Sequence, residues 1–327
     1  MKHCRPALAH VLIGGLVILL LSFGSMPTQK VAAGPKDQTL NPFEDRSDPV
    51  LLIASYYNAI LLHDYARAYG YWDAAPQGQT LTQFSQGFAN TADVVVAVAL
   101  LIQEDGAAGT IFAAVPTLLV ATQNDGTQQA FVGCFVTRVS NVPTGDDPDP
   151  SHNPWFLADG LTTFESTAVN TVNVNLLRTA CEQQGVNDIP LDSRDNPIML
   201  LRSYYNAVQL KDYNRAYNYW DTSPNGLTYN QFVQGYANTT DVLVVVHLPF
   251  EYDGAAGTIY ASLQTILIGT ERNTAPQRFY GCYVTRNSDV GTGPTPPPPY
   301  WRLYANSIQP APTNATDIAL LTTPCEF

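Results

Sequence analysis

Apolar and aromatic side chains recur at helical spacing in two short segments that follow residue 48. The first segment begins with Pro49, a residue that suits the first position of a helix. Its apolar positions lie three and four residues apart, at Ile53, Tyr56, Tyr57 and Ile60. The second segment has the same spacing, at Tyr65, Ala68, Tyr69 and Trp72. Asp64 precedes it and suits the N-cap. We therefore predict a pair of amphipathic helices.

A third short helix follows, and the pattern then becomes typical of strands. The helix carries Gly87 between two phenylalanines, which indicates a close approach of another backbone. Apolar, valine-rich runs predict four strands, over residues 93–103, 109–123, 130–140 and around 155–164. Asp105-Gly106 and Asn124-Asp125-Gly126 suit the turns between them. Three helices followed by an antiparallel meander predict an α+β domain.

The whole pattern occurs twice. Residues 49–138 match residues 197–286 without a gap, and roughly half of the aligned positions are identical. The offset (197 − 49 = 148 residues) is far longer than the period of a solenoid, which is about 20–50 residues. The chain is therefore predicted to contain two tandem domains. The expected divisions are a signal peptide (1–33), an N-terminal tail (34–48), domain 1 (49–181), a linker (182–196) and domain 2 (197–327).

Composition and charge narrow the class of protein. The chain has 327 residues, of which 45% are hydrophobic and only 13% are charged, with a formal net charge of −12. An acidic chain lacks the basic surface that nucleic acid or anionic lipid requires. The N-terminus has a positive start, an apolar run over residues 11–23 and the small residues Val31-Ala32-Ala33, which predict cleavage before Gly34. We expect a secreted or extracytoplasmic protein, with an uncleaved N-terminal anchor as the alternative.

Four cysteines remain after the predicted cleavage. Cys134 and Cys282 are equivalent in the two repeats, and Cys181 and Cys325 each lie near the end of a repeat. Four cysteines allow three pairings. The duplication favours Cys134–Cys181 and Cys282–Cys325, because a single ancestral domain needs its own bridge. No histidine lies near the cysteines at ligand spacing in both repeats, so we expect no metal.

The order of elements resembles the NTF2-like (SnoaL-like) superfamily of cone-shaped α+β domains, with its paired N-terminal helices that here end in Tyr71-Trp72 and Tyr219-Trp220. The chain also resembles tandem domains of secreted bacterial proteins. The resemblance covers both repeats and implies helices packed on a curved antiparallel sheet, a pocket between them, and packing of the repeats as an internal pseudo-dimer. The family often has a small strand pair before the third helix, whereas here only a short Pro-Gly loop stands in that place.

Aspartates shared by the repeats are the candidates for acid–base chemistry, because no histidine position is shared. If either domain is an isomerase, dehydratase or cyclase, the resemblance implies a pocket acid or base, and the candidates are Asp73, Asp93, Asp221 and Asp241. The structural alternative is that Asp73 or Asp93 forms a buried bridge with Arg138.

The aromatic residues are interpreted first as the core between helices and sheet. Their alternative role is to line a pocket for an apolar or sugar-like ligand, with Tyr71 and Tyr219 at its mouth. The candidate ligand-binding residues are Tyr57, Tyr69, Tyr71, Trp72, Arg138, Tyr205, Tyr217, Tyr219, Trp220 and Arg286.

Three functions remain open from the sequence. The first is a non-catalytic exported protein that binds a small ligand or a cell-surface partner, without a cofactor. The second is the enzyme described above. The third is a structural interaction module whose interior is filled by its own aromatic side chains. The fold alone does not choose among them.

Overall fold

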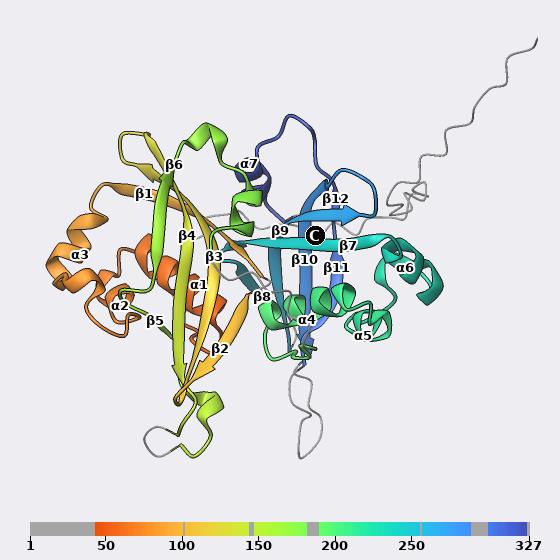
Figure 1. The fold of residues 1–327 in the computed structure, drawn as a ribbon, viewed down its shortest axis with the longest axis horizontal. Coiled ribbons are helices and arrows are strands. Elements are labelled where there is room, and N and C mark those ends of the chain that lie inside the picture. Colours follow the sequence, from red (N-terminus) through yellow and green to blue (C-terminus); the bar gives the residue numbers. More distant parts are fainter. Residues whose placement is uncertain are drawn as a thin grey trace, which may run out of the picture.

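The computed structural model describes residues 43–100, 102–143, 147–181, 190–255, 257–288 and 300–325. The predicted signal peptide (1–33), most of the predicted tail and linker residues 182–189 lie outside this part of the chain. The described residues form an α+β structure with one large antiparallel sheet and a few helices (Figure 1). None of these helices has the length and apolar character needed to cross a membrane.

Each repeat begins with three helices, as predicted. In the first repeat these are α1 (Pro49–Leu61), α2 (Tyr65–Tyr69) and α3 (Leu81–Gly87). In the second they are α4 (Pro197–Gln209), α5 (Tyr213–Asn218) and α6 (Tyr229–Tyr236). A 3-10 turn precedes the third helix of each repeat, at Pro76–Gly78 and Pro224–Gly226. A last helix, α7, covers Asp317–Leu321.

Polar side chains fix the starts of these helices. The Asp48 carboxylate accepts the Val50 N–H at 2.7 Å, and Pro49 occupies the first helical turn. Asp64 caps α2 by accepting the Arg67 N–H at 3.2 Å, as its position in the sequence predicts. Thr80 begins α3 with a capping box, in which its side chain and that of Gln83 each bond the other residue's backbone N–H.

The strands of the first repeat are β1 (Thr91–Ala99), β2 (Gln103–Ala107), β3 (Thr110–Gln123), β4 (Gln128–Ser140), β5 (Phe156–Leu157) and β6 (Thr163–Thr167). A short 3-10 segment lies between β4 and β5, at Pro150–His152, and two more follow β6, at Val169–Thr171 and Val174–Arg178. The strands of the second repeat are β7 (Thr239–Leu248), β8 (Glu251–Ala255), β9 (Thr258–Glu271), β10 (Gln277–Ser288), β11 (Arg302–Asn306) and β12 (Gln309–Pro310).

Two details of the predicted strands are wrong. Asp105-Gly106 is not a turn but lies within β2, which pairs with the start of β3. The turn comes at Ala108 and Gly109, which both have positive φ. The predicted fourth strand is divided into β5 and β6. The turn Asp159-Gly160, in which Gly160 has a φ of 74°, separates them.

The two repeats share one sheet, joined through β1 and β7. Within the described residues the strand order is β11-β10-β9-β7-β1-β3-β4-β5. Val98 pairs with Val246, and these are equivalent positions (98 + 148 = 246). On one side of this pair Ala97 pairs with His247, and on the other side Ala99 pairs with Val245. Position 97 is equivalent to 245 and position 99 to 247, so the two flanking pairs are related by the same symmetry. The junction therefore has the register of a two-fold symmetric dimer, and the repeats lie side by side in Figure 1.

Successive side chains of the strands point to opposite faces of this sheet, and both faces are covered. Val244 and Val246 belong to a core that includes α1 and α4, and we call this side the inner face. Leu243 and Val245 belong to a second core with Leu177 and Leu321, which come from the segment Val174–Arg178 and from α7. This outer face is thus covered by the C-terminal segment of each repeat.

Polar contacts also cross between the repeats. On the outer face, Asp317 of α7 accepts the Val174 N–H at 2.7 Å, and Arg178 forms an ion pair with Asp241 at 2.7 Å. On the inner face, Arg202 of α4 lies 3.2 Å from the Asp48 carboxylate, and both side chains are only 3% exposed.

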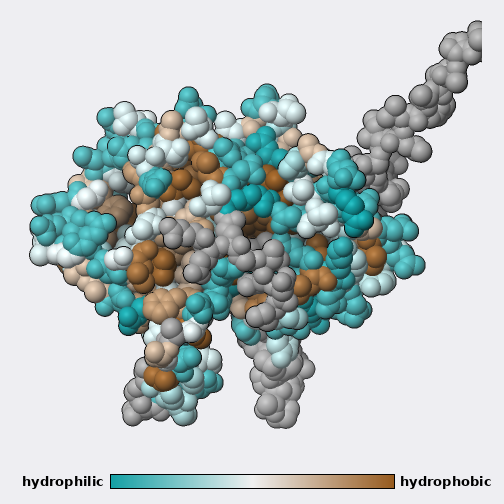
Figure 2. All heavy atoms as spheres, viewed as in Figure 1, coloured by the Kyte–Doolittle hydropathy of each residue, from teal (hydrophilic) through white to brown (hydrophobic). Residues whose placement is uncertain are grey.

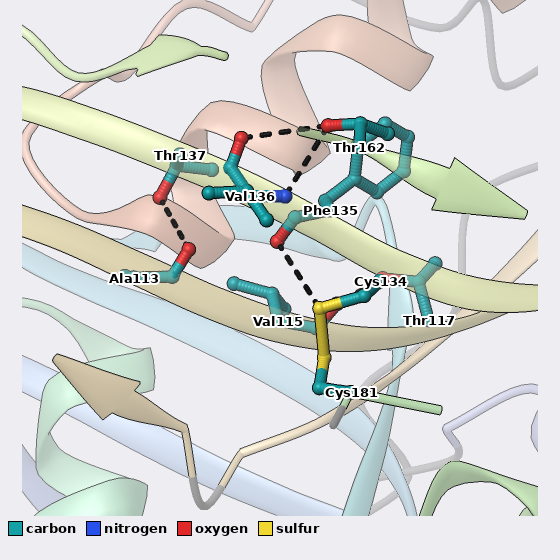
Figure 3. The surroundings of a disulfide bond; sticks show 9 residues. All are labelled: Ala113, Val115, Thr117, Cys134, Phe135, Val136, Thr137, Thr162 and Cys181. Carbon is teal, nitrogen blue, oxygen red and sulfur yellow. Dashed lines mark hydrogen bonds between the residues drawn. A yellow bond between two sulfur atoms is a disulfide. The ribbon is translucent and has the colours of Figure 1, made fainter. Parts of the chain in front are cut away.

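Two disulfides hold the C-terminal segments to the sheet. Cys134 of β4 bonds Cys181, and Cys282 of β10 bonds Cys325. This confirms the pairing within each repeat. Figure 3 shows the first bridge beneath β4, beside Phe135 and Val115. In the chain-entropy model, loops of 47 and 43 residues give about 4 kcal/mol each.

Glycines allow a close approach next to each bridge. A Cβ on Gly133 would lie 2.0 Å from the Thr163 carbonyl oxygen of β6. A Cβ on Gly281 would lie 2.5 Å from the Ser307 carbonyl oxygen. By contrast, a Cβ on Gly87 meets nothing within 4 Å, so the predicted close approach there is wrong.

Hydrophilic residues cover most of the face drawn in Figure 2, and its hydrophobic residues form separate patches. Only 13% of the chain is charged, so uncharged polar side chains supply much of this surface. The long apolar strands are correspondingly covered by helices and loops on both faces.

Candidate functional site

The second repeat contains a cavity of about 300 Å³ between helices α4–α6 and the inner face of the sheet. Aromatic side chains form a large part of its walls, with contributions from Tyr204, Tyr205, Trp220, Phe232, Tyr236, Phe279 and Tyr283. Polar side chains from α6 and from the ends of β7 and β9 complete the lining. A volume of this size accommodates a small organic molecule.

Four tyrosine hydroxyls are paired with each other in this wall. The hydroxyl oxygens of Tyr204 and Tyr236 are 2.8 Å apart, and those of Tyr205 and Tyr283 are 2.6 Å apart. Burial raises the pKa of all four phenols, so they are neutral donors and acceptors at neutral pH. The hydroxyls satisfy one another and leave the ring faces for contact.

Three other polar groups of the lining have no partner among the described residues. The Nε1 of Trp220 and the Oγ1 of Thr239 are buried without a hydrogen bond. The Trp220 N–H lies near the Tyr204 hydroxyl without meeting hydrogen-bond geometry, and it opposes the larger rise in the Tyr204 pKa that burial causes. Glu271 is 6% exposed, and its carboxylate has neither a hydrogen bond nor an ion pair. Unpaired groups of this kind are rare inside proteins.

The alternation of β9 directs Glu271 inward. Leu263, Leu267 and Gly269 occupy the inner face of this strand, and Glu271 follows in phase at its end. Thr239 lies directly opposite it, since the two residues are paired in the register of β7 and β9. A carboxylate and a hydroxyl therefore stand side by side at one end of the cavity.

The equivalent positions of the first repeat are less polar. Gln123 stands in place of Glu271, and Phe88 and Phe135 stand in place of Tyr236 and Tyr283. In addition, Phe164 packs against Phe135 with ring centroids 4.8 Å apart. The residue in the same position beside Gly281 is Ile308, which is smaller and lines the cavity.

Of the predicted ligand-binding residues, Tyr205 and Trp220 line the cavity. Tyr217 lies behind it, with its hydroxyl donating to the carbonyl of Leu227 at 3.0 Å. In the first repeat Tyr57, Tyr69 and Trp72 pack within the aromatic core. The interpretation as core and the interpretation as pocket thus each apply to part of the set.

Tyr71 and Tyr219 are not at a pocket mouth, and that prediction is wrong. Their exposed fractions are 2% and 0%. The Tyr219 hydroxyl donates to the Asp192 carboxylate at 2.7 Å, and burial with this carboxylate raises the Tyr219 pKa to about 12. Both rings turn inward because the helical spacing ends before them, where α2 and α5 stop.

The predicted aspartates and arginines lie away from the cavity lining. Asp73 pairs with Arg138 at 3.3 Å, and Asp221 pairs with Arg286 at 2.5 Å, at equivalent places in the two repeats. The predicted pairing of Asp73 with Arg138 is therefore observed, but it is not a buried bridge, because the Arg138 side chain is 48% exposed. The remaining two, Asp93 and Asp241, lie at the start of β1 and β7. Asp93 is exposed, whereas Asp241 pairs with Arg178.

Sequence reasoning did not single out Glu271 and Thr239. A signal was available, because Glu271 is a carboxylate on the inward-facing positions of an apolar strand and Gln123 replaces it in the other repeat. Among the described residues, no group of three or more His, Cys, Asp and Glu side chains is arranged to hold a metal ion.

Comparisons with protein families, with curated proteins and with solved structures find no significant match to this chain.

Proposed function

We propose that this chain is an exported, non-catalytic binding protein built from two NTF2-like domains, with its ligand site in the second. The observation that carries the proposal is the cavity of about 300 Å³ with unpartnered polar groups in its buried wall. Native proteins rarely leave such groups unsatisfied. A small ligand that fills the cavity would provide the missing partners.

The assignment to NTF2-like domains rests on the order of elements and on the position of the cavity. Three helices precede an antiparallel sheet in each repeat, and the cavity lies between those helices and the sheet. Such a pocket is the place where this superfamily holds ligands.

Binding is favoured over the catalysis suggested by the sequence because the four candidate aspartates lie outside the cavity lining. Asp73 and Asp221 each pair with an arginine, and neither Asp93 nor Asp241 lines the cavity. A general base must lie within hydrogen-bond reach of its substrate. The enzyme hypothesis therefore loses its named candidates, while the aromatic wall suits binding.

Export is supported by the N-terminal sequence pattern and by the two disulfides, which form and persist in oxidising compartments. Cleavage before Gly34 produces the mature chain, and an uncleaved anchor is the alternative. The mass of the purified protein distinguishes these two forms.

Native mass spectrometry of the exported, oxidised protein tests the binding function. We expect extra mass that disappears on denaturation. The matched variant is Ile308→Phe, because the first repeat holds Phe164 in this position, so the fold accepts the ring. This variant should lose the extra mass. A bare mass for the wild-type protein, or full retention of the extra mass in Ile308→Phe, would contradict the proposed site.

A further inference from the structure

We infer that the cavity of the second repeat takes a small organic ammonium ion with an apolar, preferably aromatic, body. This inference rests on the proposed binding function and names the chemical class of the ligand. It is carried by the unpaired carboxylate of Glu271 and by the aromatic rings that line much of the remaining space.

The first argument is the environment of Glu271. Its side chain is 6% exposed, and no cation or hydrogen-bond donor among the described residues reaches it. A carboxylate with so little contact with water is less favourable than one that is paired and hydrogen-bonded. No lysine, arginine or histidine is among the described residues that line the cavity. A cationic ligand would therefore supply the positive charge that the lining lacks.

The second argument is the chemistry of the neighbouring group. Thr239 is paired with Glu271 in the register of the sheet, and its Oγ1 also lacks a partner. Both side chains offer acceptor oxygens at the same end of the cavity. An ammonium group carries three donors and no acceptor, so it satisfies both. An alcohol supplies a single donor, and an anion would be repelled.

The third argument is the rest of the wall. Tyrosine and phenylalanine rings present negative faces, which attract a cation and also pack against an apolar body. The hydroxyls of Tyr204, Tyr205, Tyr236 and Tyr283 are already paired with each other, so the rings add little demand for polar partners. The lining thus has one carboxylate at one end, and aromatic rings among uncharged polar and aliphatic side chains elsewhere.

The test compares two probes of nearly equal shape, 2-phenylethylammonium and 2-phenylethanol, by isothermal titration calorimetry with the full-length mature protein. We expect the ammonium probe to bind roughly tenfold more tightly or better, because a charge-assisted hydrogen bond is about twice as strong as a neutral one. The matched variant is Glu271→Gln, since Gln123 occupies this position in the first repeat. It should bind both probes about equally, and its retained binding of 2-phenylethanol shows that the cavity is intact.

Equal affinity of the wild-type protein for both probes overturns the ammonium assignment and leaves the binding function standing. A preference that survives in Glu271→Gln also overturns it, because the charge then acts elsewhere. Failure of both probes to bind overturns the assignment as well. The native mass spectrum then decides whether the binding function fails with it, since a bare mass removes both.

Discussion

His247 of β7 lies on the outer face of the sheet, opposite Ala97 of the first repeat. Burial lowers the pKa of its imidazole to about 4, and the carboxylate of Asp93 opposes this shift. The Nδ1 atom has no hydrogen-bond partner among the described residues. Protonation would therefore place a poorly compensated charge at the junction of the repeats.

We expect the free energy of unfolding to fall as the pH drops from about 6.5 to about 4. The folded-state pKa is below the unfolded value, so the unfolded chain binds the proton more readily in this window. The stability is fully present above the unfolded pKa, and about 2–3 kcal/mol is lost on the way down. Urea titrations across this range measure the loss. His247→Ala, which installs the residue of the first repeat (Ala99), should flatten the dependence, and an unchanged slope would exclude His247 as its cause.

The hydroxyl pair of Tyr205 and Tyr283 gives a second prediction at this scale. Tyr283→Phe installs the residue of the first repeat, Phe135, and leaves the buried Tyr205 hydroxyl without its partner at 2.6 Å. We expect a loss of about 1 kcal/mol in unfolding free energy, measured by urea denaturation. Phe135→Tyr in the first repeat is the reciprocal control. A Tyr283→Phe variant as stable as the wild type would mean that the pair contributes nothing net.

The sequence predicted residues whose roles follow from local spacing. Cysteine pairing followed from the duplication, and the aromatic residues on the helices followed from the period of 3.6. Glu271 could not be assigned in the same way, because its importance comes from burial and from missing partners. The alternation of β9 places Glu271 on the inner face, but its missing partners depend on which other elements meet there, and no local pattern encodes those.

At the scale of elements, close approach of β10 to the Ser307 region depends on Gly281. This glycine has φ of 148°, and a Cβ there would lie 2.5 Å from the Ser307 carbonyl oxygen. The same region carries Ile308, which lines the cavity. The glycine thus determines how near the last strands lie to the ligand site.

Gly281→Ala should lower the unfolding free energy by about 2 kcal/mol, because the backbone of the neighbouring segment must move. The control is Gly87→Ala, where a Cβ meets nothing within 4 Å; we expect it to change stability by less than about 1 kcal/mol. Thermal unfolding of the two variants under one condition provides the comparison. Equal effects would show that the close approach at Gly281 does not limit stability.

The helices were predicted well because Pro49, Asp64 and the apolar spacing all act locally. The division of the strands was predicted less well. Asp105-Gly106 suits a turn, but both residues lie in the short strand β2, because β2 pairs with β3 as a hairpin. Strand pairing is a non-local interaction, so sequence alone places its limits poorly.

For the whole molecule, Arg202 is an asymmetric contact between two nearly symmetric halves. It contacts Asp48 at 3.2 Å and Glu104 at 3.0 Å, both in the first repeat. Burial raises the Asp48 pKa, and the Arg202 charge opposes that rise. With the repeats interchanged, Ala54 takes the place of Arg202 and Asn196 takes the place of Asp48. These two residues cannot form an ion pair.

Arg202→Ala should destabilise the protein by about 3 kcal/mol, because it leaves the Asp48 carboxylate buried without its partner. Asp48→Asn combined with Arg202→Ala installs the residues of the other repeat at both positions, Asn196 and Ala54. We expect this double variant to recover a large part of the loss, since an asparagine also caps the helix. Chemical denaturation of the two single variants and the double variant completes the cycle. Additive losses would show that the two side chains are not coupled.

The sequence alone predicted the duplication, but it did not predict that the repeats join through β1 and β7. The register about Val98 and Val246 is symmetric, but nothing in the strands marks them as partners. Valine-rich strands of this kind are buried on both faces and can pair with several neighbours.

This junction also has a consequence for solubility. A lone repeat would expose the edge of β1 or β7, and an unpaired apolar edge is a template for further strands from other chains. In the tandem chain the two edges belong to one molecule, so each meets its partner at an effective concentration on the order of millimolar, at any dilution of the protein. The tandem arrangement therefore lets β1 and β7 pair within one chain before either edge meets a strand of another molecule.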